Sequence, residues 1–169
     1  MRYNLIRSID ISNGVGIACS VFFQGCSHHC VGCFNPETWD FNGGKEWTKT
    51  VEDKFIILCQ SPFIKCVSLL GGEPFDQPRI EIYNLLKRIK KEVNKTVFVW
   101  SGYRFEELME RCTISDCFTE GLIDVLIDGK FELKHKDLKL RLCGSSNQRI
   151  IDIKETLKKN QITLLTMRF

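Results

Sequence analysis

The chain has 169 residues, of which 43% are hydrophobic and 27% are charged. This length fits one domain with a core of its own, and the composition is ordinary for a globular protein. The formal net charge of +3 is too small to indicate a nucleic-acid partner. No stretch approaches the roughly 18 apolar residues that cross a membrane, and no apolar export signal begins the sequence. We therefore expect one cytoplasmic domain over residues 1–169, with neither a nucleic-acid nor a membrane partner.

Nine cysteines are spread over the sequence. A disulfide framework is not expected, because the number is odd and the export signal is missing. One group of three is clustered within eight residues and is considered below. Three others lie in apolar segments and are expected to be small buried hydrophobes: Cys19, Cys59 and Cys66. The last three have no recognisable ligand spacing, and we interpret them as structural: Cys112, Cys117 and Cys143.

Apolar runs of strand length alternate along the chain with segments of helical periodicity. The predicted strands, several of them bounded by turn signals, are 3–9, 17–23, 66–70, 96–100, 124–128, 149–153 and 162–165. The predicted helices are one that is capped by Thr50 and ends before Pro62, then 79–93, 105–112 and 154–159.

This alternation of strands and helices predicts an α/β fold with a mainly parallel sheet and helices outside it. A closed eight-stranded barrel typically needs about 250 residues, so the chain is too short for one. We expect an open, partial (βα) barrel instead. Loops that bind ligands should then leave the C-terminal edge of the strands.

The clustered cysteines, Cys26, Cys30 and Cys33, have the spacing C-x3-C-x2-C. Four protein ligands are usual for a structural zinc or an electron-transfer cluster, whereas three leave one iron of a cluster open to another ligand. This spacing resembles the signature of the radical S-adenosylmethionine (SAM) enzymes, in which three cysteines hold a 4Fe-4S cluster and SAM chelates the fourth iron. The alternative from the residues alone is a zinc site with His28 or His29 as fourth ligand.

A second motif, Gly71-Gly72-Glu73-Pro74, follows the predicted strand 66–70 directly. Two glycines allow a ligand to approach the backbone closely, and Pro74 fixes the direction of the chain after them. A tight turn is the alternative. Together with the cysteines, the motif resembles the GGEP sequence with which radical SAM enzymes hold the methionyl amino group.

Two further strand ends carry candidate SAM contacts. Ser101 and Gly102 end the strand 96–100 and are candidates for contact with the ribose or the methionine carboxylate of SAM. Asp128 and Lys130 end the strand 124–128, where Lys130 could pair with the carboxylate and Asp128 with a ribose hydroxyl or an ion. Ordinary solvated turns remain the alternative at both places.

Two local sequences point to one family within the radical SAM superfamily. Residues 26–35 resemble the C-x-H-x-C-x-G-C-x-N form of activating enzymes of anaerobic, class III ribonucleotide reductases, and residues 144–149 resemble their G-S-S-N-Q-R motif. The resemblance implies a radical SAM domain over the whole chain and an oxidoreductase activity. The cluster would cleave SAM reductively to a 5′-deoxyadenosyl radical, which generates a glycyl radical on the reductase.

The same resemblance implies two protein partners, the large subunit of the reductase and an electron donor such as flavodoxin. The basic stretch from Lys134 to Arg149 is a candidate docking surface. Two other functions stay open at this point. One is a radical SAM enzyme for another glycyl-radical partner or a small molecule, and the other is a non-catalytic zinc or iron-sulfur binding module.

Overall fold

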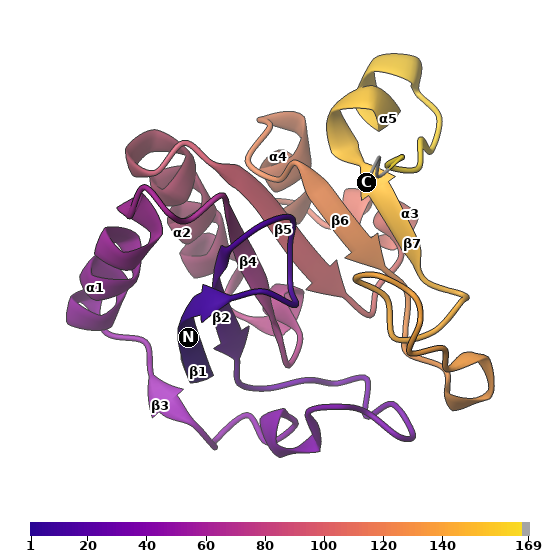
Figure 1. Ribbon diagram of the computed structural model, residues 1–169, viewed down its shortest axis with the longest axis horizontal. Helices are drawn as coiled ribbons and strands as arrows, with labels where there is room; N and C mark the ends of the chain where they lie inside the picture. The colour runs from indigo at the N-terminus through magenta and orange to yellow at the C-terminus, as the bar shows by residue number, and fades with distance from the viewer. Residues whose placement is uncertain (167–169) are drawn as a thin grey trace.

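The computed structural model describes residues 1–166, which form an α/β fold around one seven-stranded sheet (Figure 1). The strands are β1 (Arg2–Asp10), β2 (Ala18–Phe23), β3 (Lys45–Glu46), β4 (Cys66–Gly71), β5 (Thr96–Ser101), β6 (Val125–Asp128) and β7 (Arg149–Asp152). The α-helices are α1 (Lys49–Gln60), α2 (Arg79–Glu92), α3 (Phe105–Met109), α4 (Ile114–Thr119) and α5 (Ile153–Lys159). Short 3-10 turns are η1 (Pro36–Thr38), η2 (Pro74–Asp76) and η3 (Leu133–His135).

The strand order is β3-β1-β2-β4-β5-β6-β7. The central strands β2, β4, β5 and β6 run parallel, while β1 and β3 on one side and β7 on the other are antiparallel to their neighbours. β3 and β7 form the two edges, so the sheet is open. The predicted α/β fold with a mostly parallel, open sheet is confirmed, and its likeness to the radical SAM partial barrel stays a prediction.

The helices α1 to α4 pack on one face of the sheet and form the main core with it (Figure 1). Alternate strand residues face these helices, such as Val21, Leu69 and Val99. A smaller apolar cluster that includes Phe98 and Ile127 lies on the opposite face, where Leu142 packs against it. The face without these helices is therefore the one that is left for a ligand cavity.

The structure differs from the predicted elements at several places. Thr48, not Thr50, caps α1, because the helix begins at Lys49 and the Thr48 side chain accepts a hydrogen bond from Val51 N. α3 ends at Met109 rather than at 112, and the unpredicted helix α4 follows it. The predicted strand 162–165 is reduced to one bridge between Leu164 and Ile151. None of the helices in residues 1–166 has the length and apolarity to cross a membrane.

Candidate functional site

A cavity of about 460 Å³ opens at the C-terminal ends of β2, β4 and β5. This is the sheet edge at which the sequence predicts ligand binding. Eight of the eleven predicted site residues line the cavity: Cys26, Cys30, Cys33, Gly71, Gly72, Glu73, Ser101 and Gly102. Pro74 is buried directly behind them as the first residue of η2. Three motifs that are far apart in the sequence thus meet in one place.

The cysteine loop, residues 24–35 between β2 and η1, wraps around one side of the cavity. The chain turns back at Gly25 (φ 101°) and Gly32 (φ 76°), conformations that favour glycine. Asn35 N donates a hydrogen bond to Cys33 Sγ at 3.4 Å. Such a donor stabilises negative charge on a ligand sulfur, as hydrogen bonds from outside the ligand set do at metal centres.

Two thiols of the cysteine loop, those of Cys26 and Cys30, lie in an environment that favours their protonated form in the absence of a metal. Burial, together with the charges of Glu73 and Asp76, raises the pKa of Cys26 to about 11, against the lowering effect of local backbone hydrogen bonds. Burial also raises the pKa of Cys30. Metal ions displace such protons on binding, and three soft sulfur donors on one cavity wall fit an iron-sulfur cluster.

The zinc alternative needs a histidine as its fourth ligand, and both candidates have other partners. His28 Nε2 lies 3.1 Å from Glu73 Oε2, and the His29 ring stacks on Trp39 at 4.9 Å between centroids. Within residues 1–166, no three His, Cys, Asp or Glu side chains surround one common ion. In a cluster each cysteine binds a different iron, so the sulfurs lie farther apart than around a single zinc. Because neither histidine can become a fourth zinc ligand without giving up its present partner, the three thiols fit a cluster better than zinc.

Glu73 connects the three motifs. Its side chain is 1% exposed, and its Oε1 accepts hydrogen bonds from Phe75 N (3.0 Å) and Ser101 Oγ (2.9 Å). Its Oε2 accepts one from Gly102 N (2.7 Å) and contacts His28 Nε2. Because these partners occupy the carboxylate, Glu73 braces the cysteine loop against β5.

The glycines of the motifs are required by close packing. A Cβ on Gly72 would lie 2.4 Å from Gly25 O, and a Cβ on Gly102 would lie 2.3 Å from His28 Cδ2. Gly71 has φ +108°, and its Cβ would lie 2.6 Å from Phe22 Cα. The absence of side chains at these positions allows the strand ends to contact the cysteine loop directly.

Asp76, which the sequence analysis did not single out, and Tyr103, which continues the Ser101-Gly102 motif, hold the cysteine loop from outside. Asp76 Oδ2 accepts a hydrogen bond from Ser27 N (2.8 Å), and its Oδ1 accepts one from Tyr103 OH (2.7 Å). The Tyr103 ring packs on His28 at 4.3 Å between centroids, with the Arg111 guanidinium 3.7 Å from its centre. Asp76 lies two residues after the GGEP motif, which is the sequence signal that could have identified it, and Tyr103 directly follows Ser101 and Gly102.

Comparison with known proteins places these motifs in a family. A model described as "4Fe-4S single cluster domain" matches residues 12–151. Proteins named "Anaerobic ribonucleoside-triphosphate reductase-activating protein" match along almost their whole length. The Salmonella typhi protein is 41% identical over 152 residues, which cover 88% of this chain and 96% of the relative. The Escherichia coli K12 protein is 40% identical with the same coverage, and the enterobacteria phage T4 protein is 34% identical over 89% of this chain and 93% of the relative.

The chain belongs to the anaerobic ribonucleoside-triphosphate reductase-activating protein family. The family resemblance predicted from the cysteine loop and the late motif is thus confirmed. The match to the 4Fe-4S single cluster domain extends from the turn before β2 to β7 and contains all the predicted site residues. An iron-sulfur domain in this activating-protein family is in keeping with the three thiols at the cavity.

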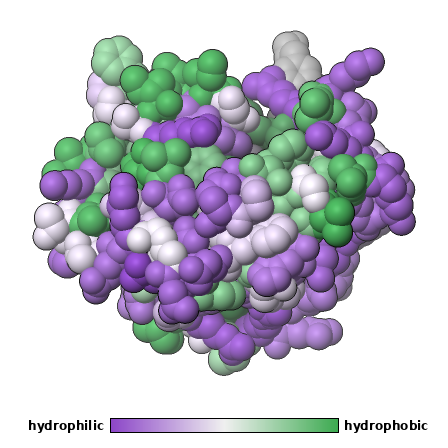
Figure 2. All heavy atoms as spheres, turned by 90° about the horizontal axis from the view of Figure 1, so that it is seen from below, coloured by the Kyte–Doolittle hydropathy of each residue, from purple (hydrophilic) through white to green (hydrophobic). Residues whose placement is uncertain are grey.

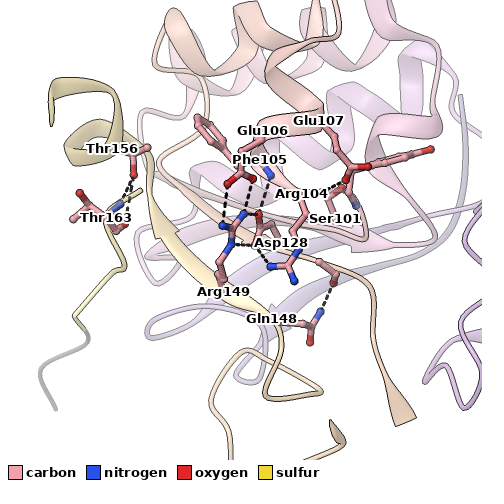
Figure 3. A network of polar contacts seen from close by, with 12 residues as sticks. Ser101, Arg104, Phe105, Glu106, Glu107, Asp128, Gln148, Arg149, Thr156 and Thr163 are labelled. Carbon is pink, nitrogen blue, oxygen red and sulfur yellow. Dashed lines mark hydrogen bonds and ion pairs between the residues drawn. The ribbon is translucent and has the colours of Figure 1, made fainter. Parts of the chain in front are cut away.

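In this member of the activating-protein family, Asp128 and Lys130 do not line the cavity, although the adjacent residues Gly129 and Phe131 do. Asp128 is fully buried, pairs with Arg149, and accepts a hydrogen bond from Phe105 N at 2.8 Å (Figure 3). Arg149 also binds Glu106, with Nη2 2.7 Å from its Oε2. Lys130 is exposed. Asp128 thus joins β6, β7 and α3, and the expected contacts of the two residues with SAM stay a prediction.

The late motif of the family, residues 144–149, closes a loop on itself. Gln148 Nε2 donates to Gly129 O at 2.9 Å, and its Oε1 accepts from Gly144 N at 2.8 Å. Asn147 Nδ2 donates to Lys130 O at 2.8 Å. These hydrogen bonds hold the preceding segment, residues 131–143, beside the cavity. Five residues of this segment line the cavity wall, which the sequence analysis did not predict: Phe131, Leu138, Leu140, Leu142 and Cys143.

Proposed function

We propose that this chain cleaves SAM reductively at a 4Fe-4S cluster held by Cys26, Cys30 and Cys33, and thereby generates a glycyl radical on an anaerobic ribonucleoside-triphosphate reductase. The observation that carries the proposal is the convergence of the three cysteines and the GGEP motif on one cavity. The printed name of the relatives, an activating protein for this reductase, supports the choice of substrate.

When bound, the cluster would supply the electron that breaks a carbon–sulfur bond of SAM. The chain's own residues would bind and orient SAM. The backbone of Gly71 and Gly72 offers carbonyl oxygens to the ammonium group of SAM, and Ser101 and Gly102 lie beside its ribose or carboxylate. Glu73 positions these elements. Apolar side chains on the cavity wall exclude water from the reacting groups: Phe22, Phe34, Leu70, Trp100 and Phe131.

The partners follow from this activity. The substrate is the large subunit of the reductase, and an electron donor such as flavodoxin reduces the cluster. We place the reaction in the cytoplasm, where such donors are found, and it requires neither nucleic acid nor membrane.

The first test is anaerobic iron-sulfur reconstitution, followed by electron paramagnetic resonance of the reduced protein with and without SAM. We expect a 4Fe-4S signal that changes shape when SAM is added, because SAM reaches the open iron. Incubation with the reductase should then produce a glycyl-radical signal. Absence of a cluster, or a cluster signal that does not change with SAM, would contradict the proposed enzymatic activity. The remaining function would then be that of a non-catalytic metal-binding module. SAM cleavage without a glycyl radical on the reductase would indicate another substrate.

A further inference from the structure

Residues 130–142, called the basic loop here, form an ordered structure beside the cavity. Ser145 Oγ accepts a hydrogen bond from Glu132 N at 3.2 Å. Farther along, Ser146 N donates to His135 O at 2.9 Å and Asp137 N donates to Gly144 O at 3.2 Å. With the contacts of Asn147 and Gln148 described above, these bonds fix the loop before any partner arrives.

The basic loop carries an unbalanced charge. Its five basic residues outnumber its two acidic ones: Lys130, Lys134, Lys136, Lys139 and Arg141 against Glu132 and Asp137. Its net charge of +3 equals the formal net charge of the whole chain, so the other residues balance to zero. A positive field concentrated at one place steers an oppositely charged partner toward it.

Exposed apolar side chains lie among these charges. Leu133 and Leu138 of the basic loop are 50% and 74% exposed, and Val31 and Phe34 of the cysteine loop are 75% and 52% exposed. Figure 2 views the molecule from below the orientation of Figure 1 and shows groups of hydrophobic side chains among hydrophilic ones. Exposed apolar groups rimmed by polar residues mark interaction sites.

The two loops form one continuous surface. A Cβ on Gly32 would lie 2.9 Å from Leu133 Cδ1, so the cysteine loop packs directly on the basic loop. The ring centroids of Phe34 and Phe131 lie 5.1 Å apart, and Lys136 Nζ lies 5.3 Å from the centroid of the Phe34 ring. Anything that binds this surface therefore also touches the mouth of the cavity.

We propose that the basic loop, together with residues 31–34, is the docking surface for the reductase, and that the matching surface of the reductase is acidic around an apolar centre. This inference rests on the proposed function. Exposed aliphatic and aromatic residues among the charges are typical of a surface for a protein partner, whereas nucleic-acid interfaces are more polar and more positive throughout.

The position of the surface favours the reductase over the electron donor. Leu138 and Leu140 are exposed and also line the cavity, so a partner docked there presents its own chain to the reacting groups. Hydrogen abstraction requires such direct entry of the substrate segment, because the reacting atoms must come into contact. Electron transfer does not require that the donor enter the cavity.

The test is the charge-reversed double variant Lys134→Glu/Lys139→Glu. The matched control, Lys54→Glu/Lys91→Glu, makes the same charge change at exposed positions of α1 and α2. Both proteins would be reconstituted anaerobically. Glycyl-radical yield and affinity for the reductase would be measured over a range of ionic strength, and SAM cleavage with a chemical reductant would be measured without the reductase.

We expect the double variant to bind and activate the reductase roughly tenfold less well than the control at low ionic strength. The wild-type affinity should fall as salt is added, and the affinity of the variant should depend on salt less. Reductase-independent SAM cleavage should be equal in both proteins, which separates a docking defect from failure of the proposed activity. Activation equal to the control would overturn the inference. So would a defect confined to self-association or to binding of a duplex oligonucleotide.

Discussion

Each carboxylate oxygen of Glu73 has two partners inside the protein. One of these four partners, His28, belongs to the cysteine loop and contacts Oε2. A buried carboxylate is stable only when its hydrogen-bonding capacity is filled. The geometry of the cavity therefore depends on side chains that need not touch the ligand. In the proposed site, Glu73 therefore positions the cysteine loop, and binding of the cluster is left to the cysteines.

Removal of any one ligand should abolish cluster assembly. We expect Cys26→Ala, Cys30→Ala and Cys33→Ala each to lose the iron-sulfur content and SAM cleavage, because two thiolates cannot hold a cluster that needs three. Iron and sulfide per chain after anaerobic reconstitution would be measured, with the exposed Cys112→Ala as control. A variant that keeps a full cluster and full turnover would not have lost a ligand.

Gly102→Ala tests whether β5 positions the cysteine loop. The new methyl group would overlap His28, so we expect a loss of about 1–3 kcal/mol in the free energy of unfolding and a lower cluster content. Gly121→Ala is the matched control, because it strains a backbone with φ +68° but contacts nothing within 4 Å. Chemical denaturation and iron content would be compared. Equal cluster content in both variants would show that the contact between Gly102 and His28 does not position the cysteines.

At the scale of elements, β2, β4, β5 and β6 were predicted to within one residue at each end, because strands buried on both faces appear as continuous apolar runs. α4 was missed, since its six residues show too few turns for a periodicity to be recognised. The cysteines and glycines were found by spacing and turn chemistry, which are local. The roles of Glu73 and Asp128 depend on partners from distant segments, which a single sequence does not reveal.

The junction of α3, β6 and β7 should be sensitive to Arg149. Arg149→Gln would leave the carboxylate of Asp128 buried without its main partner, at an expected cost of about 3 kcal/mol in the free energy of unfolding. A second cation limits this loss of stability, because Arg104 Nη1 lies 3.7 Å from Asp128 Oδ1 and remains in the variant. Chemical denaturation under reducing conditions would measure it, with the exposed Arg79→Gln as control. Addition of Asp128→Asn should restore part of the stability. No restoration would contradict an electrostatic origin.

For the whole molecule, the main core and the cavity lie on different sides of the sheet. The core that the helices form contains none of the three ligand cysteines. The fold and the candidate cluster are therefore coupled mainly through the strand ends.

Removal of iron should consequently leave the fold largely intact. We expect the apoprotein, prepared with a chelator under reducing conditions, to keep its far-ultraviolet circular dichroism and a cooperative thermal transition, because burial of the main core does not involve the cysteine loop. Hydrogen exchange should increase at residues 24–35, with α2 amides as the internal control. Cooperative unfolding on loss of iron would show that the cluster is required for the fold.

Hydrogen bonds between residues 129–132 and 145–148 join the two ends of the basic loop, which bears on how its sequence can vary among members of the family. The side chains of Ser145, Asn147 and Gln148 bind main-chain atoms of residues 129–132, so these hydrogen bonds do not depend on the side chains of residues 133–143. Residues 133–143 could therefore be replaced as one segment. If the basic loop docks the reductase as proposed, exchange of residues 133–143 between two members of the family is expected to transfer the choice of reductase, although it also replaces Leu133, which contacts the cysteine loop at Gly32.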